Sequence, residues 1–141
     1  MAASHNNLGA LERLRGNHAA AEAHLRQALA IQRSALGIDH PETAQALHNL
    51  ADALLAGGKV AEADAHLRQA LLVKERAFGP DHPWVAETLL VLGALHASRR
   101  DQDAAAAAFE RAEAIWERTP PMNPLIQAEA LANLADRKSV V

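Results

Sequence analysis

Apolar residues follow the spacing of two α-helices in the middle of the chain. Leu47, Leu50 and Leu54 recur at intervals of three and four residues, which places them on one face of a helix. After Gly57-Gly58 the same spacing resumes at Ala63, Leu67, Ala70, Leu71 and Lys74. Because glycine readily ends a helix in a left-handed conformation, this pattern predicts a short helical hairpin.

The hairpin pattern repeats every 42 residues. Residues 23–50 align with residues 65–92 at 15 identical positions out of 28, including the block AHLRQAL, and a degraded third copy, AAFERAE, begins at Ala107. A period of this length indicates stacked helix–turn–helix units. We expect a single array over residues 1–141, itself a fragment of a longer array. Its expected parts are units at about 1–40, 41–82 and 83–123 and a terminal helix at 124–137, about seven helices in all.

Two joints between units carry the same glycine, aspartate, histidine and proline, in ALGIDHPETA and AFGPDHPWVA. A repeated Asp-His pair is compatible with a metal or catalytic site, whereas glycine at a helix end and proline in the next first turn mark a connection. Asp39 and Asp81 are predicted to accept hydrogen bonds from the free amides there. At the third joint Asn123-Pro124 replace His-Pro, so the connection is favoured. We expect no metal site, no cofactor and no catalytic residue.

The residues at these offsets resemble the tetratricopeptide repeats, specifically the 42-residue kinesin-light-chain type. That family has Leu-Gly or Leu-Ala in the first helix, Gly at the hairpin, and Ala, a large apolar residue and Ala in the second helix. The matching residues are Leu8-Gly9, Gly16, Ala21, Leu25 and Ala28; Leu50-Ala51, Gly58, Ala63, Leu67 and Ala70; and Leu92-Gly93, Ala105, Phe109 and Ala112. Arg100 stands at the third hairpin glycine, and the family's usual tyrosine is absent. The resemblance implies an all-α solenoid of antiparallel helix hairpins, wound as a right-handed superhelix.

The first helix of each unit lines the concave side in that family. By this resemblance, the peptide-binding groove is expected to contain Asn6, Asn7, Gln45, His48, Asn49, Asp52, Glu87, Glu129, Asn133 and Asp136. Amide side chains offer donors and an acceptor, and so can pair with the backbone of an extended peptide. The carboxylates among these residues favour a basic peptide. The alternative is that all of them form an ordinary solvated helix face.

Composition and charge narrow the range of partners. Half of the 141 residues are apolar, with two Trp, two Phe and no Tyr, as closely packed helices require. A net charge of −3 and a pI near 6.2 give no electrostatic footprint for nucleic acid or for an anionic membrane. The chain lacks cysteine, a signal peptide and an 18-residue apolar run, so we expect a cytoplasmic protein without disulfides.

These features together predict a protein-interaction scaffold that is not an enzyme. A second hypothesis is a regulatory or sensory module of a larger signalling protein, such as a kinase or a transcription regulator. Apolar residues at the open ends of the array would also permit self-association. Trp84 and Trp116 are candidate peptide anchors, although the place of Trp84 after the joint proline favours a role in covering the neighbouring helix.

Overall fold

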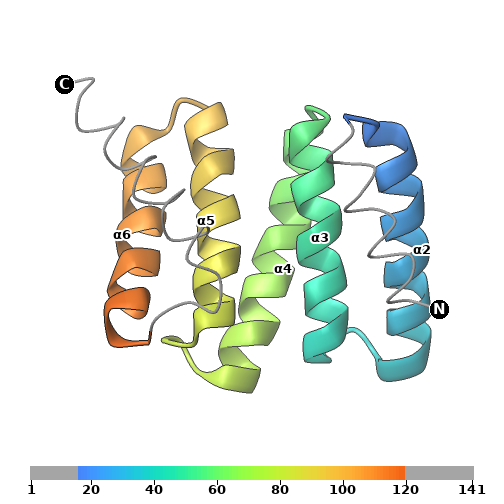
Figure 1. Cartoon of the computed structure of the whole chain (residues 1–141), viewed down its shortest axis with the longest axis horizontal. Coiled ribbons are helices and arrows are strands. Elements are labelled where there is room, and N and C mark those ends of the chain that lie inside the picture. The colour runs from blue at the N-terminus through green and yellow to red at the C-terminus, as the bar shows by residue number, and fades with distance from the viewer. Residues whose placement is uncertain (1–15, 120–141) are drawn as a thin grey trace. The chain divides into compact units, whose positions relative to one another are not determined.

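The computed structural model describes residues 16–119, which form helices joined by short connections (Figure 1). The helices are α2 (His18–Leu36), α3 (Pro41–Ala56), α4 (Val60–Phe78), α5 (Pro83–Ser98) and α6 (Gln102–Arg118). The all-α class predicted from the sequence is therefore confirmed. The first and the last of the expected helices, with the end of the 83–123 unit, fall outside the described residues.

The chain divides into two compact halves, Met1–Val73 and Lys74–Val141, with the boundary inside α4. In the N-terminal half α2 packs against α3. The core of this half consists of alanine, leucine and one valine side chain that are at most 7% exposed: Ala21, Leu25, Ala28, Leu29, Ala44, Ala46, Leu47, Leu50, Ala51, Ala53, Leu54, Ala63, Leu67, Ala70 and Val73. The apolar positions identified from the helical spacing are buried, except Leu71, which is half-buried. The division into 42-residue units remains a prediction.

In the C-terminal half α5 packs against α6, and Gly93 allows the two helices to approach closely. A Cβ atom at Gly93 would lie 2.6 to 2.9 Å from three ring carbons of Phe109, well inside van der Waals contact. The Phe109 ring is itself only 3% exposed. The absence of a side chain at this repeat position therefore permits the close approach, because only glycine leaves room for the ring.

Each hairpin turn contains one residue in the left-handed backbone region. Gly16 and Gly58 have φ of 77° and 84°, and Arg100 has φ of 61° at the equivalent position of the third hairpin. L-residues with a side chain adopt this conformation at a cost that glycine does not have. Within residues 16–119, Arg100 is the one residue other than glycine that has a positive φ.

We expect Arg100→Gly to stabilise the protein by about 0.5–1 kcal/mol. The relief of left-handed strain exceeds the entropy that glycine adds to the unfolded chain. Urea denaturation of the full chain measures the change. Arg99→Gly is the matched control, because Arg99 has φ of −88° and gains nothing from glycine. A loss of stability in Arg100→Gly would contradict the prediction.

Candidate functional site

Four of the expected groove residues lie together on one face of α3. Gln45, His48, Asn49 and Asp52 occupy positions i, i+3, i+4 and i+7 of the helix, so their side chains lie on the same face. We call these four residues the α3 strip. His48 is 9% exposed, and the other three are half-buried. The strip is therefore partly sheltered from water.

Hydrogen bonds orient the side chains of the α3 strip. Nε2 of Gln45 donates to Oδ1 of Asn49 at 3.2 Å. This bond fixes the Asn49 amide so that its NH₂ group is directed away from Gln45. His48 and Asp52 each take part in a polar interaction as well. The strip thus presents oriented donors and acceptors, as the recognition of a peptide backbone requires.

The other expected groove residues do not belong to the described part of the N-terminal half. Asn6, Asn7, Glu129, Asn133 and Asp136 lie outside the described residues. Glu87 is on α5, in the C-terminal half. A common groove remains a prediction; of its expected residues, the structure describes the α3 strip and Glu87.

Glu87 lies near a buried lysine that the sequence pattern placed among core positions. Lys74 is fully buried, and its Nζ donates to Oγ1 of Thr88 at 2.9 Å, with the carbonyl oxygen of Trp84 at 3.5 Å. Burial lowers the pKa of Lys74 to about 8, against the opposing effect of the Glu87 carboxylate. Helical periodicity identified the buried position correctly, but it gave no sign that the ammonium group would find a partner on α5.

Burial also changes the acid–base properties of Glu87. It raises the pKa of the carboxyl group, while the positive charge of Lys74 acts in the opposite direction. A half-buried carboxylate beside a lysine contributes less net negative charge than a solvated one. Of the described groove residues, Asp52 is therefore the stronger basis for a preference for basic peptides.

The two joints are capped by histidine, so the prediction that Asp39 and Asp81 cap these helices was wrong. His40 and His82 have extended backbones, and each Nδ1 accepts a hydrogen bond at 3.1 Å from the backbone N–H two residues later. Imidazole can reach this amide because histidine occupies the N-cap, whereas each aspartate is one residue too early. The repeated histidines thus have a structural role at the start of α3 and α5.

The second joint also gathers aromatic rings around a surface hollow. Phe78 stacks on His82 with ring centroids 4.6 Å apart, and Trp84 packs edge-on against Phe78 at 5.0 Å. The hollow has a volume of about 530 Å³ and is lined by these rings and by Gly79, Pro80, Asp81, Pro83 and Thr119. We call it the joint hollow. The sequence pointed to Trp84 as a covering residue, but it did not show that Phe78 and His82 would meet it.

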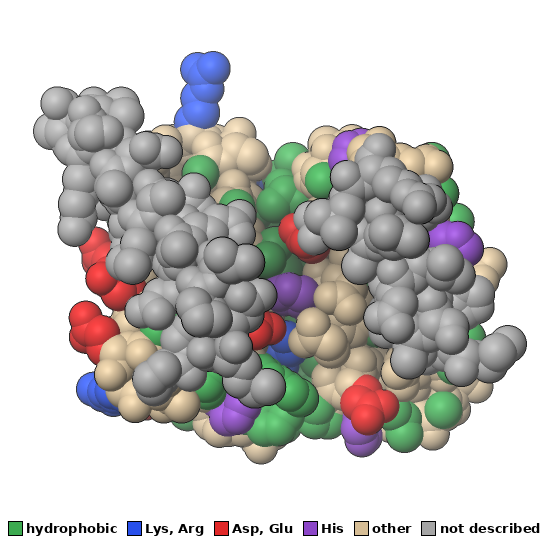
Figure 2. Space-filling view, viewed as in Figure 1, with side chains coloured by type: hydrophobic (Ala, Val, Ile, Leu, Met, Phe, Trp, Pro, Cys, Tyr) green, Lys and Arg blue, Asp and Glu red, His purple; other side chains and the backbone are tan. Residues whose placement is uncertain are grey.

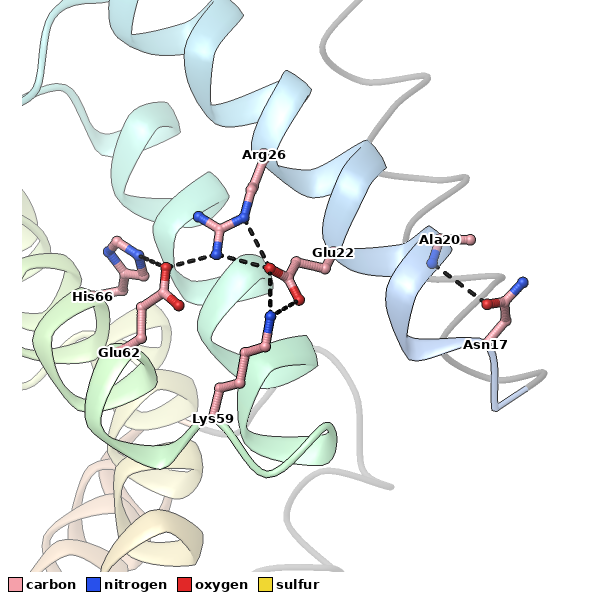
Figure 3. Close-up of polar contacts among 7 residues, drawn as sticks. All are labelled: Asn17, Ala20, Glu22, Arg26, Lys59, Glu62 and His66. Atoms are coloured by element: carbon pink, nitrogen blue, oxygen red, sulfur yellow. Dashed lines mark hydrogen bonds and ion pairs between the residues drawn. The ribbon is translucent and has the colours of Figure 1, made fainter.

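An ion-pair network links α2 to the start of α4 within the N-terminal half (Figure 3). Glu22 pairs with Lys59 and with Arg26 at 2.8 Å, and Arg26 also reaches Glu62. The pKa of Glu22 is lowered mainly by its hydrogen bond with Lys59 and next by that with Arg26. Arg26 also lowers the pKa of Glu62. His66 extends the network, with Nε2 3.8 Å from Glu62. These side chains neutralise one another, so the network has a structural role.

The remaining polar surface of the described residues offers no candidate metal site. On the described part of the face in Figure 2, acidic, basic and histidine side chains are scattered. Within residues 16–119, no group of three or more His, Asp or Glu side chains could hold a metal ion. None of the described helices combines the length and the apolar character needed to cross a membrane.

Comparison with known proteins gives one family and a set of similar structures. A family model described as tetratricopeptide repeat matches residues 1–71 and 53–118. BtubC (BKLC) from P. vanneervenii has a TM-score of 0.84 and 25% sequence identity over 98% of this chain and 55% of its own. A Podosopora anserina kinesin light chain with nearly identical TPR-like repeats has a TM-score of 0.83 and 25% identity over 95% of this chain and 64% of its own. This chain therefore spans less than two thirds of either structure. Among curated proteins, none matches it.

Proposed function

This chain is a member of the tetratricopeptide repeat family, and we propose that it is a non-catalytic scaffold that binds an extended segment of a partner protein along the first helices of its units. Proteins with this repeat bind protein partners, and the family is generally without catalytic activity. The finer assignment, that a peptide lies on the α3 strip, rests on the residues of the strip themselves.

The hydrogen bond between Gln45 and Asn49 is the observation that carries the proposal. An ordinary solvated face has mobile, fully exposed side chains, whereas these two amides are half-buried and oriented by each other. Oriented amides lose less side-chain entropy when they bind a peptide. They can pair with the backbone of an extended segment largely independently of its sequence.

Asp52 adds a charge preference to the proposed contact. Its half-buried carboxylate lies at the C-terminal end of the α3 strip, where a lysine or arginine of the partner can pair with it. Partial burial reduces screening by salt, so the pair would contribute more than one between fully exposed side chains. The proposed ligand is therefore an extended basic segment.

We expect Asn49→Ala to weaken the binding of such a segment by about fivefold, the loss of roughly one hydrogen bond. Asp52→Lys should weaken it by about tenfold or more, because attraction becomes repulsion. The probe is an array of extended peptides of matched length that carry lysine, glutamate or only uncharged residues. Calorimetric titration of the full chain with the tightest binder gives the affinities.

Arg33→Ala is the matched control, because Arg33 is an exposed residue in the last turn of α2 and outside the strip. It should leave the affinity unchanged. Equal affinities of wild type, Asn49→Ala and Asp52→Lys would reject the α3 strip as the binding surface. A preference for the glutamate peptides would reject the charge assignment alone.

A further inference from the structure

The joint hollow occurs at one of two joints that share a backbone conformation. Gly37 and Gly79 have φ of 89° and 86°, and the capping histidines accept the same hydrogen bond at the same distance. The sequences differ in the residues that surround this frame. Leucine, isoleucine and glutamate at positions 36, 38 and 42 correspond to phenylalanine, proline and tryptophan at positions 78, 80 and 84. The connection itself needs none of the three ring-bearing residues.

These rings form an apolar surface that is open to solvent. Trp84 is 39% exposed, whereas Trp116, the other tryptophan of the chain, is 2% exposed. Two prolines, Pro80 and Pro83, extend the apolar lining of the joint hollow. Exposed tryptophan in a concave setting is typical of binding surfaces, because it contributes a large contact area at little entropic cost.

Two N–H groups of the cluster are free to bind a ligand. Since Nδ1 of His82 accepts a hydrogen bond, the neutral ring carries its proton on Nε2. No described residue accepts a hydrogen bond from Nε2 of His82 or from Nε1 of Trp84. The hollow therefore combines apolar faces with two donors, and acceptors on the ligand would complement them.

The electrostatics of the hollow favour an uncharged occupant. The carboxylate of Asp81 lies 3.6 Å from the guanidinium of Arg118, so the charge on the lining already has a counter-ion. The rings also pack directly on one another, with centroids 4.6 to 5.9 Å apart, and leave no gap between them that would enclose an ammonium group. A lysine or methylated lysine therefore does not fit this arrangement.

We propose that the joint hollow binds a proline-containing segment of a partner protein in the polyproline II conformation. Such a segment presents flat apolar rings to aromatic and proline side chains, and its carbonyl groups make no internal hydrogen bonds. Those carbonyl groups accept hydrogen bonds from Trp84 and His82. This second binding surface, in the C-terminal half, goes beyond the peptide contact proposed for α3.

The first joint supplies the variants that test this proposal. Phe78→Leu, Pro80→Ile and Trp84→Glu each introduce the residue that the chain itself carries at the equivalent position, so the connection is expected to fold. The probe is a polyproline peptide of about ten residues, which adopts the required conformation in water. A peptide of the same length with alanine in place of proline is the control ligand.

Binding at Trp84 is followed by the indole N–H resonances of the ¹⁵N-labelled full chain in NMR spectra. The resonance of Trp84 is assigned as the one that is lost in Trp84→Phe. We expect the polyproline peptide to shift the Trp84 resonance in a saturable manner and to leave that of Trp116 unchanged. In calorimetric titration, which needs no indole at position 84, the peptide should bind Trp84→Glu or Phe78→Leu at least tenfold more weakly than wild type. Asn49→Ala should bind it as wild type does, which separates this surface from the α3 strip.

Several outcomes would overturn the proposal. One is equal binding of the alanine peptide, and another is undiminished binding by a folded Trp84→Glu protein, with folding verified by its helical circular dichroism. A Trp84 resonance that shifts with protein concentration alone would assign the hollow to a second copy of this chain. A larger response to a lysine peptide than to polyproline would assign it to cations.

Discussion

Gly93→Ala is expected to destabilise the protein by about 1–3 kcal/mol, because the new methyl group overlaps the ring of Phe109. The overlap involves three ring carbons at 2.6 to 2.9 Å, so a small adjustment of a single atom cannot relieve it. The ring is buried at 3% exposure and has little freedom to turn away. α5 and α6 must therefore move apart or the ring must leave its rotamer, and either change sacrifices packing. Urea denaturation of the full chain measures the loss.

The repeat itself provides the compensating change. Ala51 and Leu67 occupy the positions of Gly93 and Phe109 in the preceding unit, and both are fully buried there. The double variant Gly93→Ala/Phe109→Leu reproduces this combination. We expect it to recover stability relative to Gly93→Ala, with a coupling energy of about 1 kcal/mol or more between the two sites. Strictly additive effects would show that the ring does not set the cost at Gly93.

The stability of the protein is expected to rise between about pH 8 and pH 10.5, and Lys74→Met should abolish this rise. Lys74 has a folded-state pKa of about 8, against 10.5 for an ordinary lysine, because burial disfavours its charged form. Between these values the unfolded chain binds more protons than the folded one, so the free energy of unfolding increases with pH. Below pH 8 both states are protonated and the cost of burying the charge is fully present. The lowered pKa corresponds to an increase of roughly 3 kcal/mol in the free energy of unfolding between pH 8 and pH 10.5.

The composition of the chain makes this measurement unusually clean. Tyrosine and cysteine, which also titrate in this range, are absent. Glu87, whose pKa is raised by burial, is present in both wild type and Lys74→Met. The expected signal is the difference between wild type and Lys74→Met in urea denaturation at a series of pH values. If the free energy of unfolding depended on pH in the same way for the two proteins, a strongly lowered pKa of Lys74 would be contradicted.

The sequence predicted the helices and most of the core because both depend on local periodicity. Leu47, Leu50 and Leu54 follow the helical repeat, and their burial needs no knowledge of the partner helix. The small residue at position 93 followed from the family resemblance. Its partner, Phe109, was identified only as a large apolar residue, and the close approach became visible with the packing of α5 on α6.

The groups with unusual chemistry were harder to predict because they depend on contacts across a turn. Lys74 appears in the sequence as one more core position of α4, and its hydrogen bond to Thr88 exists only after α5 folds back. The choice of His82 over Asp81 as the cap depends on which residue adopts the extended backbone at the N-cap. The meeting of Phe78 and Trp84 likewise requires the geometry of the joint.

The Phe109 ring occupies the space left by the missing side chain at Gly93, and this pairing limits how the number of units in such an array can change by recombination. A crossover inside a hairpin would place the second helix of one unit behind the first helix of another, and so would set Phe109 against an alanine such as Ala51. A crossover at a joint transfers both helices together and keeps each pair intact. Duplication and loss of segments in such a gene should therefore be tolerated mainly when whole hairpins are exchanged.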